Sequence, residues 1–341
     1  MSALSSEELA GIAAAMTGAG VVLDGPLRAR ALTAGRSNLT YRLDDDRASW
    51  VLRTPPRLGR TPSAHDVARE FRAIQAVGRS DVPVPPAVLL HEDEDLLGAP
   101  FAIAGYVDGR TIQTRDQLAS LDDTQLASAI EALSRALAAL HAVDHVAVGL
   151  ERFGRPDGYA ARQLKRWSGQ WEIVGAGFAA SVGELADALV ARLADRLPEQ
   201  TATGIVHGDY RLDNTLVRVE PGTVTVAAIV DWELSTIGDP VADVASMCVY
   251  RDPAFDLVIG APSAWACDRM PSAEDLAASY EKAGGVPLRD FDAHLALAYL
   301  KLAVIAAGID HRHRAGATHG DGFDTAGQAV PLLLESGLRR L

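Results

Sequence analysis

Alternating apolar and polar positions mark the first hundred residues as mainly β-structure. Short apolar and β-branched runs are separated there by turn-forming residues, among them Gly35 and the acidic triplet 44–46. Between these runs, apolar residues recur at helical spacing over 64–77, which predicts one helix. The predicted strands span 28–33, 39–43, 50–53, 88–90 and 101–107.

Beyond Gly109 the pattern becomes mainly helical. Leucine and isoleucine side chains step by four and three residues through 126–140 and form one apolar stripe. A β-branched run at 223–230 predicts a strand among the helices. We therefore expect an α+β protein with a small sheet lobe over residues 1–105 and a larger helical lobe over 106–341. The other predicted helices span 159–171, 185–197, 241–250, 273–283 and 292–309.

The longest apolar run, Leu295–Ile309, is interrupted by Lys301. It is shorter than the ~18–20 residues that a membrane span needs, so it predicts a buried helix and no membrane partner. The formal net charge of −13 argues against a nucleic-acid partner or an anionic membrane surface.

Cysteine usage and the start of the chain bear on the compartment. Cys248 and Cys267 form neither a disulfide framework nor a C-x-x-C metal motif, so free thiols in a reducing cytoplasm are expected. Glu7 and Glu8 occupy the region where a signal peptide would carry basic residues. These features favour a cytoplasmic location.

One segment carries a pattern of catalytic residues. His207-Gly208-Asp209 is followed by Asn214, which gives the H-x-D-x-x-x-x-N spacing of the protein-kinase catalytic loop. Asp231 ends an apolar run further along. Asp209 is therefore the candidate catalytic base for a substrate hydroxyl. Asn214 and Asp231 are the candidate oxygen ligands of Mg²⁺. Taken alone, Asp209 could be a solvated loop residue, Asn214 a turn former and Asp231 a cap after a strand. The spacing of all three together favours the catalytic interpretation.

Residues beside this motif are expected to be structural. His207 is predicted to hold the loop by hydrogen-bonding the backbone, and Glu233 is given a structural role. Asp239 is a candidate N-cap with Pro240 at the first helical position. Asp243 is expected to bond backbone amides of the catalytic loop.

The segment from Val206-His207-Gly208-Asp209 to Gly238-Asp239-Pro240-Val241-Ala242-Asp243 resembles the aminoglycoside phosphotransferase and choline-kinase-like superfamily. The resemblance implies a protein-kinase-like, two-lobe fold with an antiparallel sheet in the small lobe. It also implies ATP and Mg²⁺ as cofactors. In that family the aspartate of H-G-D is the base, and the asparagine and the later aspartate bind magnesium.

A narrower similarity concerns three segments, 51–53, 63–67 and 162–167. They are similar to the branch whose members are in some cases fused to acyl-CoA dehydrogenase domains. That similarity implies a hydroxy acid or a hydroxylated acyl group as the acceptor.

The N-terminal half departs from the kinase pattern. A single glycine, Gly35, with Ser37 and Asn38, stands in place of G-x-G-x-x-G. Such a loop can still donate hydrogen bonds to phosphate, although the same residues suit a simple hairpin turn. Arg53 stands where a kinase carries its phosphate-binding lysine, and it keeps the charge but changes the geometry. Glu70 on the following helix is expected to pair with Arg53.

Fold-level analogy places the adenine ring of the nucleotide. The backbone near Ala104, Gly105 and Tyr106 is expected to contact the ring, and Leu32 and Val51 to lie against its faces.

Three histidines, His311, His313 and His319, cluster with two arginines near the end of a predicted helix. A basic face that complements the helix dipole is favoured over a metal site. Under the narrower resemblance, this face and the segment 167–171 border the acceptor pocket. Its basic residues would then suit an anionic acceptor.

The leading hypothesis is an ATP-dependent kinase acting on a small hydroxylated molecule, a hydroxy acid or hydroxyacyl thioester being the expected acceptor. Two alternatives stay open. An aminoglycoside O-phosphotransferase shares the chemistry but needs an acidic pocket, and the sequence of the helical lobe does not clearly supply one. A nucleotide-binding pseudokinase with a regulatory role is suggested by Arg53 and the single-glycine loop.

Overall fold

The computed structural model describes residues 4–33, 38–55, 66–316 and 322–341. The chain divides into two compact units. The sheet unit comprises Met1–Gly109 together with Ala227–Ser235, and the helical unit comprises Arg110–Val226 and Thr236–Leu341. The predicted division at residue 105 did not include the segment Ala227–Ser235 in the first unit. The exact lobe boundary stays a prediction.

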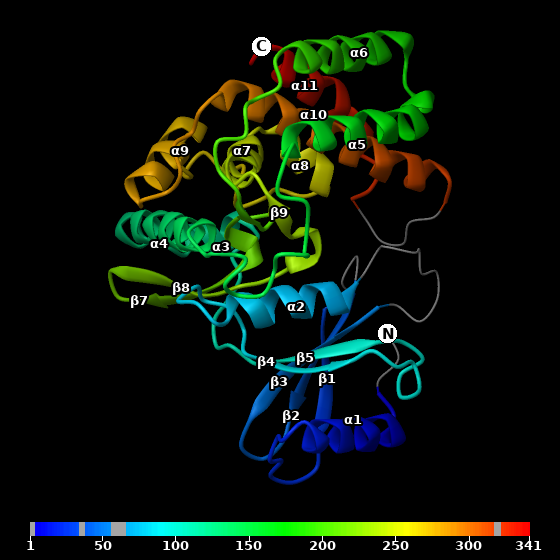
Figure 1. The fold of residues 1–341 in the computed structure, drawn as a ribbon, viewed down its shortest axis with the longest axis vertical. Coiled ribbons are helices and arrows are strands. Elements are labelled where there is room, and N and C mark those ends of the chain that lie inside the picture. Colours follow the sequence, from blue (N-terminus) through cyan, green and yellow to red (C-terminus); the bar gives the residue numbers. More distant parts are fainter. Residues whose placement is uncertain (1–3, 34–37, 56–65, 317–321) are drawn as a thin grey trace. The chain divides into compact units, whose positions relative to one another are not determined.

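A five-stranded antiparallel sheet forms the centre of the sheet unit, with the strand order β1-β2-β3-β5-β4 (Figure 1). The predicted strands are confirmed to within two residues at each end. The strands are β1 (Arg28–Thr33), β2 (Leu39–Asp44), β3 (Ser49–Thr54), β4 (Ala87–His91) and β5 (Phe101–Gly105).

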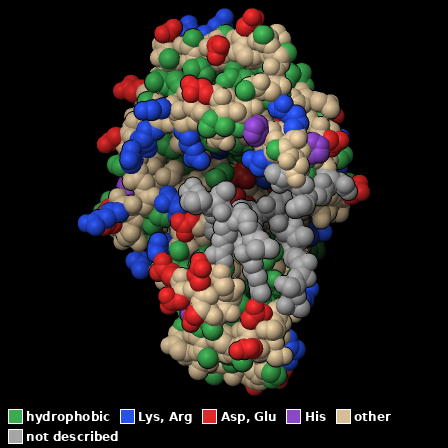
Figure 2. Space-filling view, turned by 90° about the vertical axis from the view of Figure 1, so that its right-hand side faces the viewer, with side chains coloured by type: hydrophobic (Ala, Val, Ile, Leu, Met, Phe, Trp, Pro, Cys, Tyr) green, Lys and Arg blue, Asp and Glu red, His purple; other side chains and the backbone are tan. Residues whose placement is uncertain are grey.

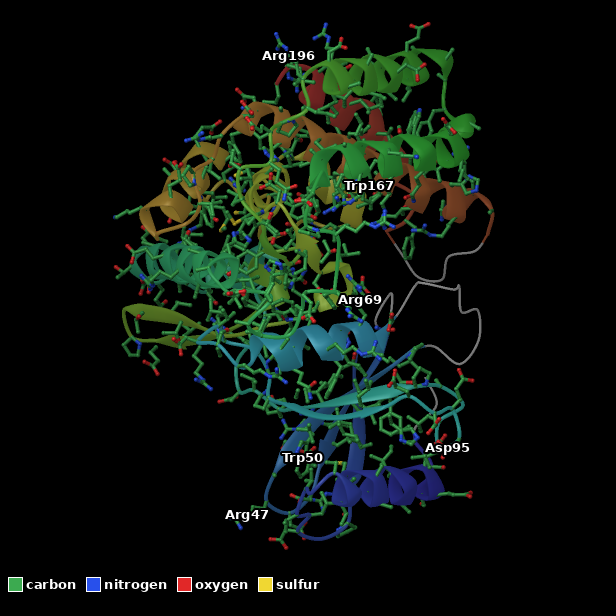
Figure 3. The ribbon with its side chains drawn as sticks, viewed as in Figure 1. Arg47, Trp50, Arg69, Asp95, Trp167 and Arg196 are labelled. Atoms are coloured by element: carbon green, nitrogen blue, oxygen red, sulfur yellow. The ribbon has the colours of Figure 1, made fainter. Side chains whose placement is uncertain are left out.

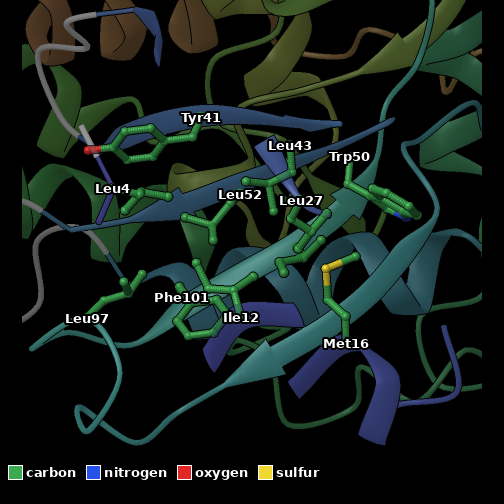
Figure 4. Close-up of a cluster of buried hydrophobic side chains, with 11 residues drawn as sticks. Leu4, Ile12, Met16, Leu27, Tyr41, Leu43, Trp50, Leu52, Leu97 and Phe101 are labelled. Atoms are coloured by element: carbon green, nitrogen blue, oxygen red, sulfur yellow. The ribbon is translucent and has the colours of Figure 1, made fainter. Parts of the chain in front are cut away.

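One face of this sheet is closed by a helix that the hydrophobic pattern did not predict, α1 (Ser6–Gly18). Its start is set by a capping box in which Ser5 and Glu8 exchange hydrogen bonds. Only Ile12 and Met16 are buried along its alanine-rich length, so its apolar periodicity is weak. They pack into a core cluster with strand side chains, shown in Figure 4, that include Leu43, Leu52, Phe101 and Ile103.

The opposite face of the sheet carries the alternate residues. Val51, Arg53, Ala102 and Ala104 are all half-buried there, because side chains along a strand alternate between the two faces. The helix α2 (Val67–Val77) packs against β4 and β5 and is capped by the Asp66 side chain. In Figure 1, α1 and α2 lie on opposite sides of the strands.

The helical unit is built mainly from long amphipathic helices. The predicted helices over 126–140, 159–171, 185–197, 241–250, 273–283 and 292–309 are all confirmed, with shifts of up to five residues at their ends. They are α4 (Asp123–His141), α5 (Tyr159–Val174), α6 (Ala180–Asp195), α7 (Val241–Val249), α9 (Ala273–Lys282) and α10 (Phe291–Arg314).

The hydrophobic pattern missed most of the remaining elements. The predicted strand at 223–230 is β8 (Thr223–Ile229), and it forms a two-stranded sheet with β7 (Thr215–Glu220). The others are α3 (Arg115–Ala119), α8 (Ala254–Ile259), α11 (Ala326–Leu338), β6 (Gly204–Val206) and β9 (Thr236–Gly238), and the 3₁₀ turns η1 (Gly175–Gly177), η2 (Leu212–Asn214) and η3 (Trp232–Leu234), the last of which lies in the sheet unit.

The helix α10 is buried over most of its central part in the helical unit. It contacts α5, α6, α7 and α11, and between His294 and Gly308 only Lys301 and Ile305 are not buried. By length and composition α10 could cross a membrane, but 78% of its apolar window is buried inside the structure. The prediction of a buried core helix is therefore confirmed.

Substitution of Leu52 tests how much the core between α1 and the sheet contributes to stability. Its side chain is fully buried, so Leu52→Ala should lower the free energy of unfolding by roughly 2–5 kcal/mol through lost burial and a residual cavity. Val22, which is 90% exposed, is the control, and Val22→Ala should stay within about 0.5 kcal/mol of wild type. Chemical denaturation, with hydrogen exchange of strand amides to report on the sheet unit, measures both. Equal effects of the two substitutions would contradict this core.

Candidate functional site

The catalytic loop begins where β6 ends and is held by a carboxylate from α7. Asp243 accepts hydrogen bonds from the backbone N–H groups of His207 (2.6 Å) and Gly208 (2.7 Å). Gly208 has φ of +87°, a left-handed conformation that glycine adopts without strain. The predicted structural role of Asp243 is therefore confirmed.

A buried chain of polar groups supports Asp243 from behind. The His141 Nε2 atom lies 3.2 Å from Asp243, and its Nδ1 atom lies 2.7 Å from the hydroxyl of Tyr280. Burial acts to raise the pKa of Asp243, but His141 and the loop amide of Gly208 hold it below its usual range. The carboxylate is thus ionised and fully occupied by structural hydrogen bonds.

Two other residues with predicted structural roles, His207 and Asp239, also bond the backbone. The His207 ring accepts a hydrogen bond from the Asp209 backbone N–H at 3.3 Å, so it holds the loop. Asp239 accepts a hydrogen bond from the Val241 N–H at 3.0 Å, and Pro240 has helical dihedral angles. The helix α7 begins at Val241 with Pro240 at its N-cap position, so the predicted N-cap Asp239 lies one residue before the cap, although its carboxylate still accepts from the first helical N–H.

Asp209 presents an ionised carboxylate within this loop. Burial acts to raise its pKa, but Arg211, a hydrogen bond from Tyr250 and the charge of Lys301 hold the pKa below its usual range. The Arg211 guanidinium lies 3.4 Å from the Asp209 carboxylate and packs over the rings of Tyr250 and Phe255. An ionised carboxylate in this position is able to accept a proton from a hydroxyl group.

Asn214 is fixed on Asp209. Its side-chain Nδ2 donates to the Asp209 backbone carbonyl at 2.7 Å and to the Asp209 carboxylate at 2.8 Å. Both amide hydrogens are therefore committed, which directs the amide oxygen to other partners. The structure brings together these two predicted residues, the candidate base and the candidate neutral oxygen ligand.

Lys301 is a site residue that sequence reasoning noted only as an interruption of an apolar run. Its ammonium group donates to the Gly208 backbone carbonyl at 2.6 Å. Burial lowers the pKa of Lys301, against the opposing effect of Asp209 and Asp243. A single lysine within the otherwise apolar run 295–309 was the signal that could have identified it, because burying an unpaired charge is costly.

In the sheet unit, three predicted residues form a second cluster. The Arg53 guanidinium lies 2.5 Å from the Glu70 carboxylate on α2 and 3.4 Å from the Asp231 carboxylate. The predicted Arg53–Glu70 pair is therefore present. Burial raises the pKa of Glu70 to about 7, although Arg53 acts to lower it.

Asp231 has an unusual backbone. Its φ of 67° and ψ of 61° are left-handed, a conformation that costs most residues about 1–2 kcal/mol and that aspartate tolerates better than most. It lies two residues after the end of β8 and immediately before the turn η3, in which the Trp232 indole donates to the Ile229 carbonyl at 3.0 Å. The buried Trp232 thus fixes the chain immediately after Asp231.

The donor set suits Mg²⁺ better than a metal that needs an all-protein cage. The described residues contain no group of three or more His, Cys, Asp or Glu side chains placed to hold a metal ion. Mg²⁺ takes hard oxygen ligands and needs only one or two from protein when phosphates and water supply the others. The carboxylate of Asp231 and the amide oxygen of Asn214 are ligands of that kind.

The remaining predicted nucleotide contacts lie in the sheet unit. Asn38 is buried, and its side-chain nitrogen and oxygen have no hydrogen-bond partner among the described residues. Gly35 and Ser37 lie outside the described residues. The Gly105 and Tyr106 amides already donate to Pro86 and Ser49 carbonyls, at 2.8 and 3.1 Å. A base contact from these two residues would therefore use their carbonyl groups.

The fold and these two clusters define a phosphotransferase of protein-kinase-like architecture. A model of the phosphotransferase enzyme family matches residues 28–294, and the chain belongs to this family. It is 32% identical to mouse acyl-CoA dehydrogenase family member 10 over 86% of this chain and 27% of the relative. It is also 32% identical to chicken acyl-CoA dehydrogenase family member 11, over 92% of this chain and 40% of the relative. The chain thus spans less than half the length of these relatives.

Solved structures agree with this assignment. A Ralstonia eutropha protein assigned as an aminoglycoside phosphotransferase superposes with a TM-score of 0.79 at 30% identity and covers 98% of each chain. A thermostable mutant of aminoglycoside phosphotransferase APH(4)-Ia, in complex with AMP-PNP and hygromycin B, has a TM-score of 0.60 at 18% identity. It covers 92% of this chain and 94% of that chain and shows likeness of fold alone.

Glu70 predicts a pH-dependent stability. Because its pKa of about 7 in the folded protein exceeds the ordinary value of 4.5, its contribution to the free energy of unfolding is complete below pH 4.5 and is lost as the pH rises through 7. Wild type should therefore lose up to about 3 kcal/mol of stability between pH 4.5 and 8 relative to Glu70→Gln. Urea denaturation across this pH range measures the difference.

Glu92→Gln is the matched control, because this carboxylate is exposed and pairs with Arg72 at the surface. It should keep the wild-type pH profile. Parallel profiles for wild type and Glu70→Gln would show that Glu70 does not change protonation in this range.

Proposed function

We propose that this chain is an ATP-dependent kinase that transfers the γ-phosphoryl group to a hydroxyl group of a small acceptor. The observation that carries the proposal is the Asp209–Asn214 pair, in which an ionised carboxylate is clamped by an amide at 2.7 and 2.8 Å. Membership of the phosphotransferase enzyme family supports the same chemistry.

In the proposed reaction, Asp209 orients the acceptor hydroxyl and takes its proton as the oxygen attacks the γ-phosphorus. The bond from phosphorus to the bridging oxygen breaks, and ADP leaves with the electron pair. Asp209 has a lowered pKa, so its main contribution is to position the hydroxyl and to accept the proton late in the transfer.

Asp231 and Asn214 would hold Mg²⁺, which when bound offsets negative charge on the phosphates. Arg53 would contact phosphate oxygens with the guanidinium edge that Glu70 leaves available, and Asn38, Gly35 and Ser37 would supply further donors. Val51 and Leu32 would lie against the adenine, near the carbonyls of Ala104 and Tyr106. The half-buried state of Val51 and Ala104 on the same sheet face as Arg53 supports this arrangement.

The proposed acceptor is a hydroxy acid or a hydroxyacyl thioester. The names of the relatives, acyl-CoA dehydrogenase family members, support an acyl substrate, although the chain covers only part of their length. APH(4)-Ia is described with hygromycin B, and at 18% identity that ligand does not transfer to this chain.

Asp209→Asn tests the base. It keeps the shape of the side chain but removes the negative charge, so turnover should fall by at least about a hundredfold while ATP still binds. ATP consumption with Mg²⁺ is measured against hydroxy acids, hydroxyacyl thioesters, amino alcohols and aminoglycosides. Asp187→Asn, an exposed position on α6, is the control and should match wild type. A wild-type protein that binds ATP but turns over no acceptor would favour the pseudokinase.

Asp231 tests the metal site. Asp231→Asn removes the charge but tolerates the left-handed backbone, so it should weaken Mg²⁺-dependent ATP binding by about tenfold or more with little loss of stability. Isothermal titration with and without Mg²⁺ measures the metal-dependent part, and thermal unfolding checks the fold. Unchanged Mg²⁺·ATP affinity in the folded variant would rule out Asp231 as a ligand.

A further inference from the structure

One edge of the largely buried helix α10 is partly open. Lys301 and Ile305 on this edge are half-buried, and the buried Gly308 and the exposed Arg312 continue the same helical face at intervals of three and four residues. At a rise of 1.5 Å per residue, the eleven steps from Lys301 to Arg312 span roughly 16 Å. Lys301 contacts the catalytic loop, so this edge leads away from Asp209.

The helix α5 contributes a parallel row of donors. A Cβ atom at Gly308 would lie 3.5 Å from the Arg312 guanidinium and 3.9 Å from the Gln170 side-chain nitrogen, so these two donors flank Gly308. Arg166 lies one turn before Gln170 on the same face of α5. Its charge acts on Lys301, which places Arg166 toward the loop end of the row.

Few carboxylates neutralise this surface. Arg166 and Arg312 are exposed, and neither takes part in an ion pair among the described residues. Arg166 packs over the ring of Trp167, which is labelled on α5 in Figure 3. The nearby Asp310 is paired with Arg314 at 2.7 Å. In the face of the molecule shown in Figure 2, basic side chains and histidines lie on the upper part, which belongs to the helical unit.

We propose that Lys301, Ile305 and Arg312 of α10, with Arg166 and Gln170 of α5, form a binding strip for an anionic acceptor. We call these five residues the α5–α10 strip. The inference rests on the proposed kinase function and narrows its acceptor to molecules that carry a carboxylate or phosphate group. Arg166 and Arg312 act here as specificity-determining residues and take no part in the phosphoryl transfer itself.

Because the strip is long, the contributions of Arg166 and Arg312 to acceptor binding can be distinguished by the length of the acceptor. An anionic group close to the reacting hydroxyl reaches only the Arg166 end, whereas a group at the far end of a long acceptor reaches Arg312. A cationic acceptor would meet unneutralised guanidinium groups along the whole strip and is therefore disfavoured.

The experiment compares charged acceptors with neutral counterparts that share the hydroxyl group. Short hydroxy acids are compared with their methyl esters, and hydroxyacyl-coenzyme A thioesters with the same acyl groups on N-acetylcysteamine. Wild type should prefer the charged member of each pair in kcat/KM. Arg166→Glu should reduce this preference by about tenfold or more for both pairs of acceptors. Arg312→Glu should reduce it by a similar factor for the long thioester pair only.

Arg192→Glu is the matched control, because it makes the same charge change at an exposed position on α6. It should leave every preference unchanged, and thermal unfolding should show all three variants folded. Equal use of charged and neutral acceptors by wild type, or equal losses in all three variants, would overturn the strip.

A binding assay separates failure of the strip from failure of the kinase function. Free coenzyme A serves as the phosphate-bearing probe and pantetheine as its uncharged counterpart, measured by titration without ATP. If no acceptor is phosphorylated, the kinase function fails, but stronger binding of coenzyme A that is lost in Arg312→Glu still supports the strip. Equal binding of the two probes by wild type would refute it.

Discussion

The arrangement of the catalytic loop depends on the buried carboxylate of Asp243. An ionised group that is fully withdrawn from water is tolerated only when hydrogen bonds replace its hydration. Asp243 obtains them from two successive loop amides and from His141. Because it bonds the amides of His207 and Gly208, it sets the backbone direction at the residue before Asp209. The orientation of Asp209, the proposed base, thus depends on α7 and α4, which carry none of the proposed catalytic residues.

Two carboxylates with contrasting surroundings illustrate how the fold assigns roles. Asp209 has Arg211, Lys301 and a tyrosine hydroxyl around it, and these outweigh burial, so it is charged under all ordinary conditions. Glu70 has a single arginine, and burial outweighs that attraction, so its pKa rises to about 7. A group that titrates near neutral pH makes the charge on the Arg53 cluster adjustable. The negative charge beside Arg53 therefore varies with the protonation of Glu70. The charge on Asp209 stays constant over the same pH range.

Local spacing explains how much of this arrangement could be predicted from the sequence. The long helices follow from apolar periodicity, and Asp209 with Asn214 follows from a fixed five-residue interval within one loop. The helix α1 was missed because it buries only Ile12 and Met16, too few to create a periodic stripe. Partners such as His141 for Asp243, or Lys301 for Gly208, lie about a hundred residues apart in the chain. No local sequence pattern predicts such pairs, because they form only when helices that are distant in the sequence pack against each other.

Charge illustrates the same distinction between the whole chain and a local surface. A net charge of −13 argues against polyanionic partners in general, yet Arg166 of α5 and Arg312 of α10 have no ion-pair partner in the part of the chain that the structure describes. Screening at physiological ionic strength limits the reach of a surface charge to about 8 Å. An acceptor bound along α5 and α10 would therefore respond to Arg166, Lys301 and Arg312 far more than to acidic residues elsewhere. The acidic composition favours solubility and the basic strip favours recognition, and the two coexist because they act over different distances.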